Sequence, residues 1–292
     1  MSDVGFIGLG KMGRGMARRL INAGLTVSVI AHRDRSAIDD LVDEGAVEVS
    51  SKIHMVETCP TILTCVSDAT AVETVAEEII PFLGSEHMWI DATTSDPETS
   101  RIISQRLDEK GCVFADAPIT GGPLQAERGE LASLVGCRRE KFNRVKAVVC
   151  HYSTIVQRFG EPGAGHTAKL LNNFVTQSTG TLLAEAYARA SRAGVDWRAL
   201  YDVMCTGAAK SGTLEKVVGP ALDGHAGSNQ FSLTHARKDI AYYQRLCERM
   251  DGHPSELAQA AYDILDRAVS DGLGDEHVSA LLKADILSRR AS

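Results

Sequence analysis

The chain has 292 residues, of which 44% are hydrophobic and 24% are charged, a composition typical of a globular protein with one large or two medium domains. Its formal net charge of −7 and the lack of a basic run argue against nucleic acid or an anionic membrane as a partner, and no stretch approaches the roughly 18 apolar residues of a membrane-spanning helix. The seven cysteines are widely spaced without a CxxC or CxxH pattern, so we expect reduced thiols in a cytoplasmic protein.

The N-terminal part of the chain alternates short apolar runs with amphipathic segments. The first run begins almost at once, with no basic leader or small-residue cleavage site before it. Amphipathic segments such as 11–23 and 97–110 separate the early runs. Because most runs are apolar throughout, we expect a parallel sheet with helices on both faces. The expected strands are 3–8, 26–31, 61–66, 88–92, 113–115, 131–135 and 153–158.

After Gly160 the pattern changes to helices. Strand signals nearly vanish, and helical stretches end at Gly194, Gly224 and Gly252. Residues 167–193 are expected to form one long helix in which Gly180 allows close packing. A helix of this length suggests the spine of a second, all-helical domain. We therefore expect an α/β domain over residues 1–162 and a helical domain over residues 163–292.

A glycine-rich turn follows the first expected strand. The GxGxxG sequence of residues 8–13 stands between the strand VGFIG and the helical segment MGRGMARRLINAG. The first glycine permits a tight turn, the second lets the backbone approach a pyrophosphate, and the third lets helix and strand pack closely. The helix N-terminus adds unpaired N–H groups. We expect a dinucleotide cofactor to be bound here by Gly8, Leu9, Gly10, Lys11, Met12 and Gly13.

The end of the second expected strand bears on the choice between NAD and NADP. An NAD-binding domain usually has a carboxylate about 20 residues beyond the last glycine, where it binds the ribose 2′-hydroxyl. Here the strand ends in His32-Arg33-Asp34, and Arg33 stands 20 residues after Gly13. A guanidinium there can pair with a 2′-phosphate, so we expect NADP(H) to be favoured and His32 and Arg33 to contact the cofactor. A shift of one residue would give Asp34 the NAD role, so NAD(H) stays possible.

Residues 163–173, GAGHTAKLLNN, place a polar stripe at the start of the long helix. Lys169 and Asn173 are four residues apart and share a helix face, with His166 three residues before the lysine. A lysine on a helix is usually a solvated surface charge, but the stripe could also be the working surface of an enzyme. His166 is best interpreted as a structural or helix-start residue.

Four stretches together resemble the β-hydroxyacid dehydrogenase family, which includes 3-hydroxyisobutyrate dehydrogenase, tartronate semialdehyde reductase and, more distantly, 6-phosphogluconate dehydrogenase. They are VGFIGLGKMGRGMA, DAPITGG at residues 116–122, GAGHTAKLLNN, and the segment from Phe231 to Lys238-Asp239. The resemblance implies a Rossmann domain, a long interdomain helix, a helical C-terminal domain and assembly into dimers or tetramers. It also implies metal-independent, reversible oxidation of a short β-hydroxyacid by a nicotinamide cofactor.

The resemblance also implies roles for single residues. Lys169 matches the catalytic lysine, and Asn173 matches the asparagine that orients the substrate. Lys238 matches a lysine that reaches the site from the C-terminal domain. Where serine is commoner in the family, this chain has Thr120, whose extra methyl group narrows the pocket. The other matching positions are Gly121 and Gly122 in the substrate loop, and Val66, Thr94, Phe231 and again Lys238 beside the cofactor.

The chemistry of alcohol oxidation is compatible with these residues. A hydroxyl proton must be removed while a hydride leaves the same carbon. The nine histidines form no HxxxH or HExxH pair, so we expect no metal site. A lysine can act as acid and base where burial or neighbouring charge lowers its pKa. We expect neutral Lys169 to accept the proton in oxidation and its ammonium form to donate it in reduction.

Two other interpretations stay open. An imine reductase of the same fold is one, although that sister group generally lacks the lysine found here as Lys169. A dinucleotide-binding protein without turnover is the other, although such a protein has no need of the lysine–asparagine pair or the substrate loop. The substrate is open among short hydroxyacids of three or four carbons.

Overall fold

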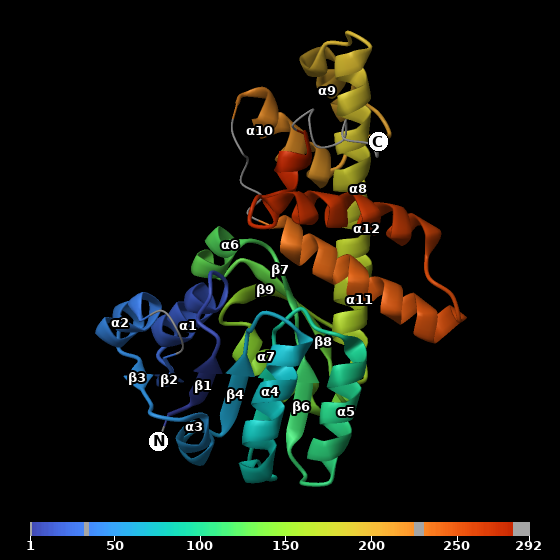
Figure 1. Ribbon diagram of the computed structural model, residues 1–292. Coiled ribbons are helices and arrows are strands. Elements are labelled where there is room, and N and C mark those ends of the chain that lie inside the picture. Colours follow the sequence, from blue (N-terminus) through green and yellow to red (C-terminus); the bar gives the residue numbers. More distant parts are fainter. Residues whose placement is uncertain (1, 32–34, 225–230, 283–292) are drawn as a thin grey trace. The chain divides into compact units, whose positions relative to one another are not determined.

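The computed structural model describes residues 2–31, 35–224 and 231–282, which form two compact units (Figure 1). The first unit is Met1–Lys169 and the second is Leu170–Ser292. The division therefore falls inside the long helix, whose first turns belong to the α/β unit.

A nine-stranded sheet forms the centre of the first unit, in the order β3-β2-β1-β4-β5-β6-β8-β7, with β9 paired to β8. Every pairing is parallel except those of β8 with β6 and β7. All seven expected strands are present, and β3 and β7 are additional. The strands are β1 Val4–Ile7, β2 Val27–Val29, β3 Val47–Glu48, β4 Thr61–Thr64, β5 Met88–Asp91, β6 Val113–Asp116, β7 Ile119–Thr120, β8 Leu131–Gly136 and β9 Ser153–Gly160.

The sheet is parallel as expected except at β8, which runs antiparallel to β6 and β7. Only residues 121–130 join β7 to β8. A parallel crossover needs a dozen or more residues, so a connection of this length favours an antiparallel neighbour.

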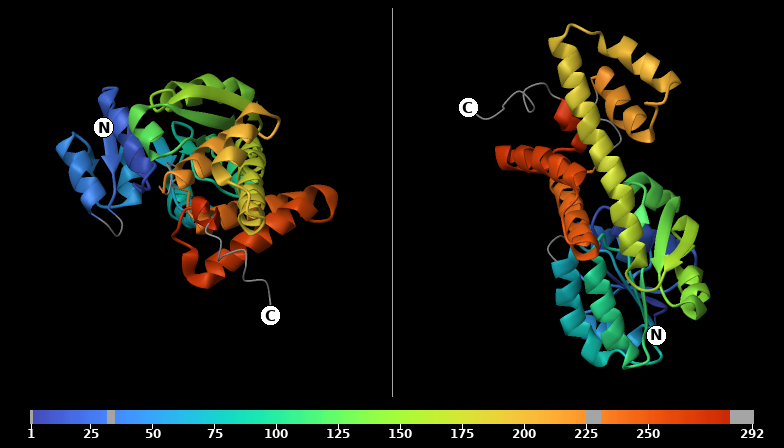
Figure 2. Two further views of the ribbon diagram at one scale, coloured as in Figure 1. Left: turned by 90° about the horizontal axis from the view of Figure 1, so that it is seen from above. Right: turned by 90° about the vertical axis from the view of Figure 1, so that its right-hand side faces the viewer.

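Helices cover both faces of the sheet, as expected. Successive strand residues point to opposite faces, so Leu63 and Ile90 enter one core while Ile62 and Trp89 enter the other. The first core is closed by α1 (Gly13–Asn22), α2 (Ser36–Asp43), α6 (Pro123–Arg128) and α7 (Phe142–Val149). The second is closed by α3 (Lys52–Thr58), α4 (Ala69–Ile79) and α5 (Pro97–Asp108) (Figure 2).

The second unit is helical in its described residues. It contains most of α8 (Ala164–Arg192), then α9 (Trp197–Thr206), α10 (Gly219–Leu222), α11 (Leu233–Asp251) and α12 (Glu256–Ala268), with shorter turns at 214–218, 269–273 and 278–282. The helical stretches end at the expected glycines, Gly194, Gly224 and Gly252, whose φ angles are 70°, 77° and 77°. Gly180 packs closely as expected, since a Cβ there would lie 3.2 Å from Val278 Cγ1.

Two further features concern the whole described chain. No helix within the described ranges is both long and apolar enough to cross a membrane. None of the seven cysteines, all of which lie in the described ranges, forms a disulfide.

Candidate active site

Four parallel strands end in register at one edge of the sheet. Ile7 of β1 pairs with Thr64 of β4, Thr64 pairs with Asp91 of β5, and Asp91 pairs with Asp116 of β6. In doubly wound folds, ligands bind outside the carboxyl ends of the strands. Four segments follow these strands at this edge, namely residues 8–13, 65–66, 92–94 and 117–122, the last of which contains β7.

The glycine turn at this edge fits the phosphates of a dinucleotide. Gly8 has a φ of 101°, and a Cβ on Gly13 would collide with the carbonyl oxygen of Gly8. By contrast, a Cβ on Gly10 would meet no protein atom within 4 Å. Helix α1 begins after the turn with no side-chain cap and no acidic residue in its first turn, so its N-terminus is suited to an anion. The turn thus forms an open cradle, within which Gly10 keeps space for a ligand.

The next two segments are joined through Thr93. The backbone N–H of Val66 donates to Thr93 Oγ1 over 3.1 Å. The N–H of Thr93 donates to Asp91 Oδ1 over 3.1 Å, and the hydroxyl of Thr64 donates to the same oxygen over 2.8 Å. These bonds set the two predicted cofactor-contact positions, Val66 and the half-buried Thr94, beside one another at the sheet edge. The other two predicted contacts at the adenosine end, His32 and Arg33, lie outside the described residues.

Asp116 caps the start of α8. Its Oδ1 accepts the N–H of Gly163 and its Oδ2 accepts the N–H of His166, both over 2.7 Å. Burial raises the pKa of Asp116, while His166 and the two N–H donors act in the opposite direction. The sequence placed Asp116 in the DAPITGG motif without a role. Its partners are about 50 residues away in the chain. The only sign of a role in the sequence was that Asp116 stands shortly before a glycine-rich loop.

His166 has the structural role that its place in the sequence suggested. Its side chain is fully buried. Its Nδ1 lies 2.6 Å from Ser100 Oγ on α5, and its Nε2 lies 2.7 Å from the carbonyl oxygen of Thr93. The histidine therefore connects α8 to α5 and to the loop after β5.

Lys169 follows one turn later on α8, with only 7% of its surface exposed. This burial excludes the alternative that Lys169 is an ordinary solvated surface charge. The residue predicted as proton carrier thus lies on the helix turn that Asp116 and His166 attach to the sheet edge.

The predicted substrate loop begins at the end of β7. Thr120 is half-buried there, and Gly121 has a φ of 126°, with Leu131 Cδ2 2.7 Å from where its Cβ would be. The N–H of Gly122, in the predicted substrate loop, donates to Gln125 Oε1 over 3.0 Å. A carboxylate that used this amide would have to displace the Gln125 side chain.

The second unit brings together residues from two motifs. The side-chain amide of Asn173 on α8 donates to Asp239 Oδ2 on α11 over 2.6 Å. Lys238 Nζ lies 3.3 Å from Asp239 Oδ1 and 5.3 Å from the centre of the Tyr242 ring. Asn173 and Asp239 are both buried. The sequence assigned no role to Asp239, although its place next to Lys238 in the KD pair was a signal.

Phe231, predicted to lie near the nicotinamide, precedes α11. Its partly buried ring packs against the core of the helical unit, with its centre 6.1 Å from that of His235. Its carbonyl oxygen accepts the N–H of Val278 over 3.0 Å. The structure therefore gives Phe231 a packing role within its own unit.

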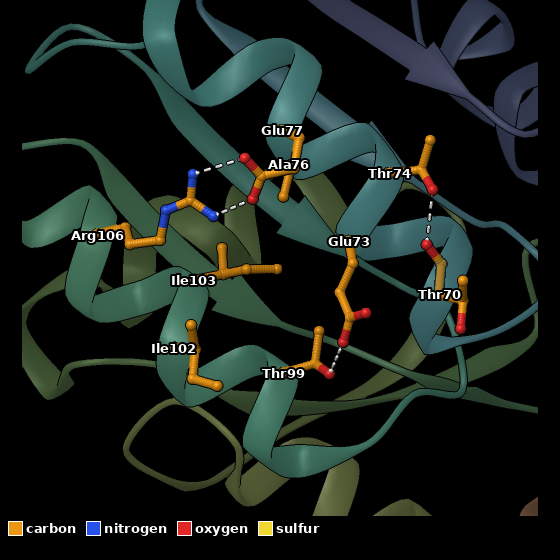
Figure 3. A pocket seen from close by; sticks show the side chains of 9 residues that line it. All are labelled: Thr70, Glu73, Thr74, Ala76, Glu77, Thr99, Ile102, Ile103 and Arg106. Atoms are coloured by element: carbon orange, nitrogen blue, oxygen red, sulfur yellow. Dashed lines mark hydrogen bonds and ion pairs between the residues drawn. The ribbon is translucent and has the colours of Figure 1, made fainter.

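A groove of about 450 Å³ lies between α4 and α5 (Figure 3). Its charged groups are paired with one another or with neighbours, Arg106 with Glu77 and Glu73 with the hydroxyl of Thr99. None of the predicted site residues lines it. Among the described residues, no three His, Cys, Asp or Glu side chains gather as a metal site would require.

The sheet edge, its glycine turn and the helical second unit define a dinucleotide-binding protein of two domains. Two family models match the chain. The model of the NAD binding domain of 6-phosphogluconate dehydrogenase matches residues 3–160. The model described as NAD-binding of NADP-dependent 3-hydroxyisobutyrate dehydrogenase matches residues 163–284.

Individual proteins show the same similarity along the whole chain. L-threonate dehydrogenase of Cupriavidus necator is 30% identical over 96% of this chain and 95% of its own length. The chloroplastic glyoxylate/succinic semialdehyde reductase 2 of Arabidopsis thaliana is 29% identical over 97% of this chain and 79% of its own. The structure of Mycobacterium tuberculosis 3-hydroxyisobutyrate dehydrogenase with L-serine shares the fold, with a TM-score of 0.88, 23% identity and full coverage of both chains. The chain belongs to the β-hydroxyacid dehydrogenase family, as its four motifs predicted.

Proposed function

We propose that this protein is an NAD(P)-dependent dehydrogenase that interconverts a short-chain β-hydroxyacid and its semialdehyde or keto acid. Family membership supports this activity, and so do relatives named as a threonate dehydrogenase and a semialdehyde reductase. The observation that carries the proposal is the buried Lys169, on a helix turn attached to the edge where the glycine turn lies.

Lys169 is the proposed acid and base. The nicotinamide cofactor, when bound, supplies the acceptor or donor of the hydride. In oxidation neutral Lys169 Nζ takes the hydroxyl proton of the substrate, and in reduction the ammonium group returns a proton to the carbonyl oxygen.

The other predicted residues bind and orient the substrate in this proposal. The amide of Asn173 has two N–H donors, of which one is held by Asp239 and the other can reach a substrate oxygen. The hydroxyl of Thr120 and the backbone of Gly121 receive the carboxylate, for which glycines permit close approach. The N–H of Gly122 joins them when the carboxylate displaces Gln125 Oε1. Lys238 adds a positive charge near the carboxylate.

NADP(H) is the proposed cofactor. Arg33 supports it, since a guanidinium at this position can pair with a 2′-phosphate, and the matching family model of residues 163–284 is described as NADP-dependent. Michaelis constants for NADPH and NADH test the choice. We expect Arg33→Ala to raise the constant for NADPH by about tenfold, the cost of losing one charge-assisted hydrogen bond, and to change that for NADH little. A strong preference of the parent protein for NADH would contradict it.

Assembly into homodimers or homotetramers is part of the same proposal. Helix α8 exposes Leu171, Val175 and Leu182, each about half or more accessible, at spacings that share one face. Exposed apolar side chains in such a row fit a second copy of the same helix. Sedimentation should show an oligomer, and Leu182→Lys should shift it towards monomer.

A panel of three- and four-carbon hydroxyacids, assayed with NAD⁺ and NADP⁺ by nicotinamide absorbance, tests the activity itself. Turnover of at least one hydroxyacid is expected. Activity on cyclic imines alone would favour the imine reductase alternative. Cofactor binding without turnover of either class would favour a binding protein.

A further inference from the structure

His166 joins three separate segments of the α/β unit through its own atoms. Its backbone N–H donates to Asp116 at the end of β6. Its ring contacts Ser100 on α5 through Nδ1 and the carbonyl oxygen of Thr93 through Nε2, at 2.6 and 2.7 Å. All these atoms are buried, so each contact is made out of water.

The direction of the hydrogen bonds follows from the partners. A carbonyl oxygen only accepts, so Nε2 must carry a proton and donate it to Thr93. The hydroxyl of Ser100 can donate or accept, so its bond with Nδ1 places no demand on the ring. The bond to Thr93 is therefore the one that only an N–H donor can make.

Thr93 connects this bond to the cofactor side of the sheet edge. Its hydroxyl oxygen accepts the N–H of Val66, and its carbonyl belongs to the peptide bond before Thr94. A continuous path of hydrogen bonds thus runs from Val66 through Thr93 to His166. Lys169 follows three residues later, on the same helix turn.

Close packing leaves this first turn of α8 little freedom. A Cβ on Gly165 would collide with the carbonyl oxygen of Leu134 and lie 2.8 Å from that of Asp116. The histidine ring is also flanked by two carboxylates, with Asp91 Oδ2 3.9 Å from Nε2 and Asp116 Oδ2 3.8 Å from Nδ1. Helix, ring and sheet edge are held in one arrangement.

We propose that His166 is a positioning residue, which through its bond to Thr93 fixes the turn that carries Lys169 against the loops that contact the cofactor. This inference rests on the proposed role of Lys169 as acid and base. It assigns to the histidine a contribution to both turnover and cofactor binding, without contact with the substrate. A misplacement of about 1 Å at a reacting group can cost up to about a hundredfold in rate, so a single well-placed bond can matter for catalysis.

Two conservative variants test the contacts of the two ring nitrogens separately. In His166→Gln the amide nitrogen can occupy the place of Nε2 and keep the bond to Thr93, while the contact with Ser100 is lost. In His166→Asn the shorter amide can keep the contact with Ser100 and loses the bond to Thr93. Ser100→Ala is the matched control, because it removes only the partner of Nδ1.

We expect His166→Asn to lower kcat by about tenfold or more and to weaken cofactor binding by about threefold or more, measured well below its Tm. His166→Gln and Ser100→Ala should stay within about threefold of the parent in both. Equal effects of Asn and Gln at position 166, or an unchanged kcat in His166→Asn, would overturn the proposal. A merely structural histidine would show losses that follow stability, and thermal melts of all three variants detect that outcome.

A further pair of measurements separates this inference from the proposed function. In a Lys169→Ala background, adding His166→Asn should cause no further loss of kcat but should still weaken cofactor binding. Normal turnover of Lys169→Ala itself would refute the role of the lysine and not the bond. In that case amide hydrogen exchange tests the positioning role of His166 by itself. His166→Asn, but not His166→Gln, should accelerate exchange in residues 92–95 and 163–169. An unchanged exchange rate in these residues overturns the positioning role.

Discussion

Asn173 and Asp239 form a buried hydrogen bond of 2.6 Å between α8 and α11. The second oxygen of the same carboxylate lies 3.3 Å from Lys238 Nζ. One aspartate therefore holds the amide from one family motif and the ammonium group from another. Asp239 orients both side chains, so its removal should release both Asn173 and Lys238 from their positions.

Asp239→Ala should lower both the free energy of unfolding and kcat. It leaves the buried amide of Asn173 without its acceptor, a loss of about 1–3 kcal/mol in the free energy of unfolding. Asp239→Asn keeps an acceptor for Asn173 but loses the charge beside Lys238, so its effect on stability should be smaller. Denaturant unfolding and kcat measure the two effects. The exposed Asp251, at the end of the same helix, provides the control Asp251→Asn, and an Asp239→Ala variant as stable and active as this control would contradict the account.

Gly10→Ala and Gly13→Ala should separate cofactor binding from folding. A Cβ on Gly10 meets no protein atom within 4 Å, so Gly10→Ala should fold with the Tm of the parent and bind NADP(H) more weakly, because the methyl group enters the space for the phosphates. A Cβ on Gly13 collides with Gly8, so that variant should lose stability. Calorimetric titration with the cofactor and thermal melts provide the readouts. Parental affinity in Gly10→Ala would show that the turn does not bind the phosphates as proposed.

Asp116→Ala should lower both stability and turnover. It removes the acceptor for two N–H groups at the start of α8, and losing a helix cap costs about 1–2 kcal/mol. Asp68 caps α4 through the N–H of Ala71, so Asp68→Ala is a matched cap deletion on another helix. Both variants should unfold at lower denaturant concentration, but only Asp116→Ala should reduce kcat under conditions where both are folded. A similar kcat in the two variants would argue against a link between the cap and Lys169.

The cysteines should differ sharply in reactivity. Burial raises the pKa of Cys112 to about 12 and that of Cys137 to about 11, whereas Cys150 is exposed. Because the thiolate is the reactive form, iodoacetamide at pH 8 should modify Cys150 in the native protein, and Cys112 and Cys137 only after unfolding. Peptide mass mapping checks this order, and rapid native labelling of Cys112 would contradict the buried position.

The same two thiols predict how stability changes with pH. Their pKa is higher in the folded state than the ordinary value of 9.0, so the folded state holds these protons more tightly. Their contribution is fully present below pH 9 and is lost as the pH rises towards 11 and 12. Unfolding free energies measured between pH 8 and pH 11 should fall less in a Cys112→Ala, Cys137→Ala double variant than in the parent.

The sequence predicted those parts of the fold that depend on local patterns. Apolar runs identified seven strands, and glycines marked the ends of the helices. The two-residue strands β3 and β7 were missed because two residues produce no recognisable pattern, and the reversal at β8 depends on a connection length that only correct strand ends reveal.

Within the site, the motifs pointed to the residues that we propose to carry the chemistry and gave no role to the residues that hold them in place. Asp116 and Asp239 act on partners 47 and 66 residues away, and nothing near them in the sequence reveals those partners. Ser100 and Thr93 have ordinary surroundings in the sequence and gain their importance from His166. Short-range patterns therefore led to the proposed chemistry, and only the three-dimensional structure showed which residues hold its groups in place.

The central claim is that Lys169 carries the proton. The most direct test is the kcat of Lys169→Ala with a hydroxyacid that the parent oxidises, together with the dissociation constant for NADP(H). Lys146, exposed on α7, provides the control Lys146→Ala. We predict a loss of at least about a hundredfold in kcat for Lys169→Ala with cofactor binding retained, and no loss for the control. Near-parental turnover of Lys169→Ala would contradict the mechanism.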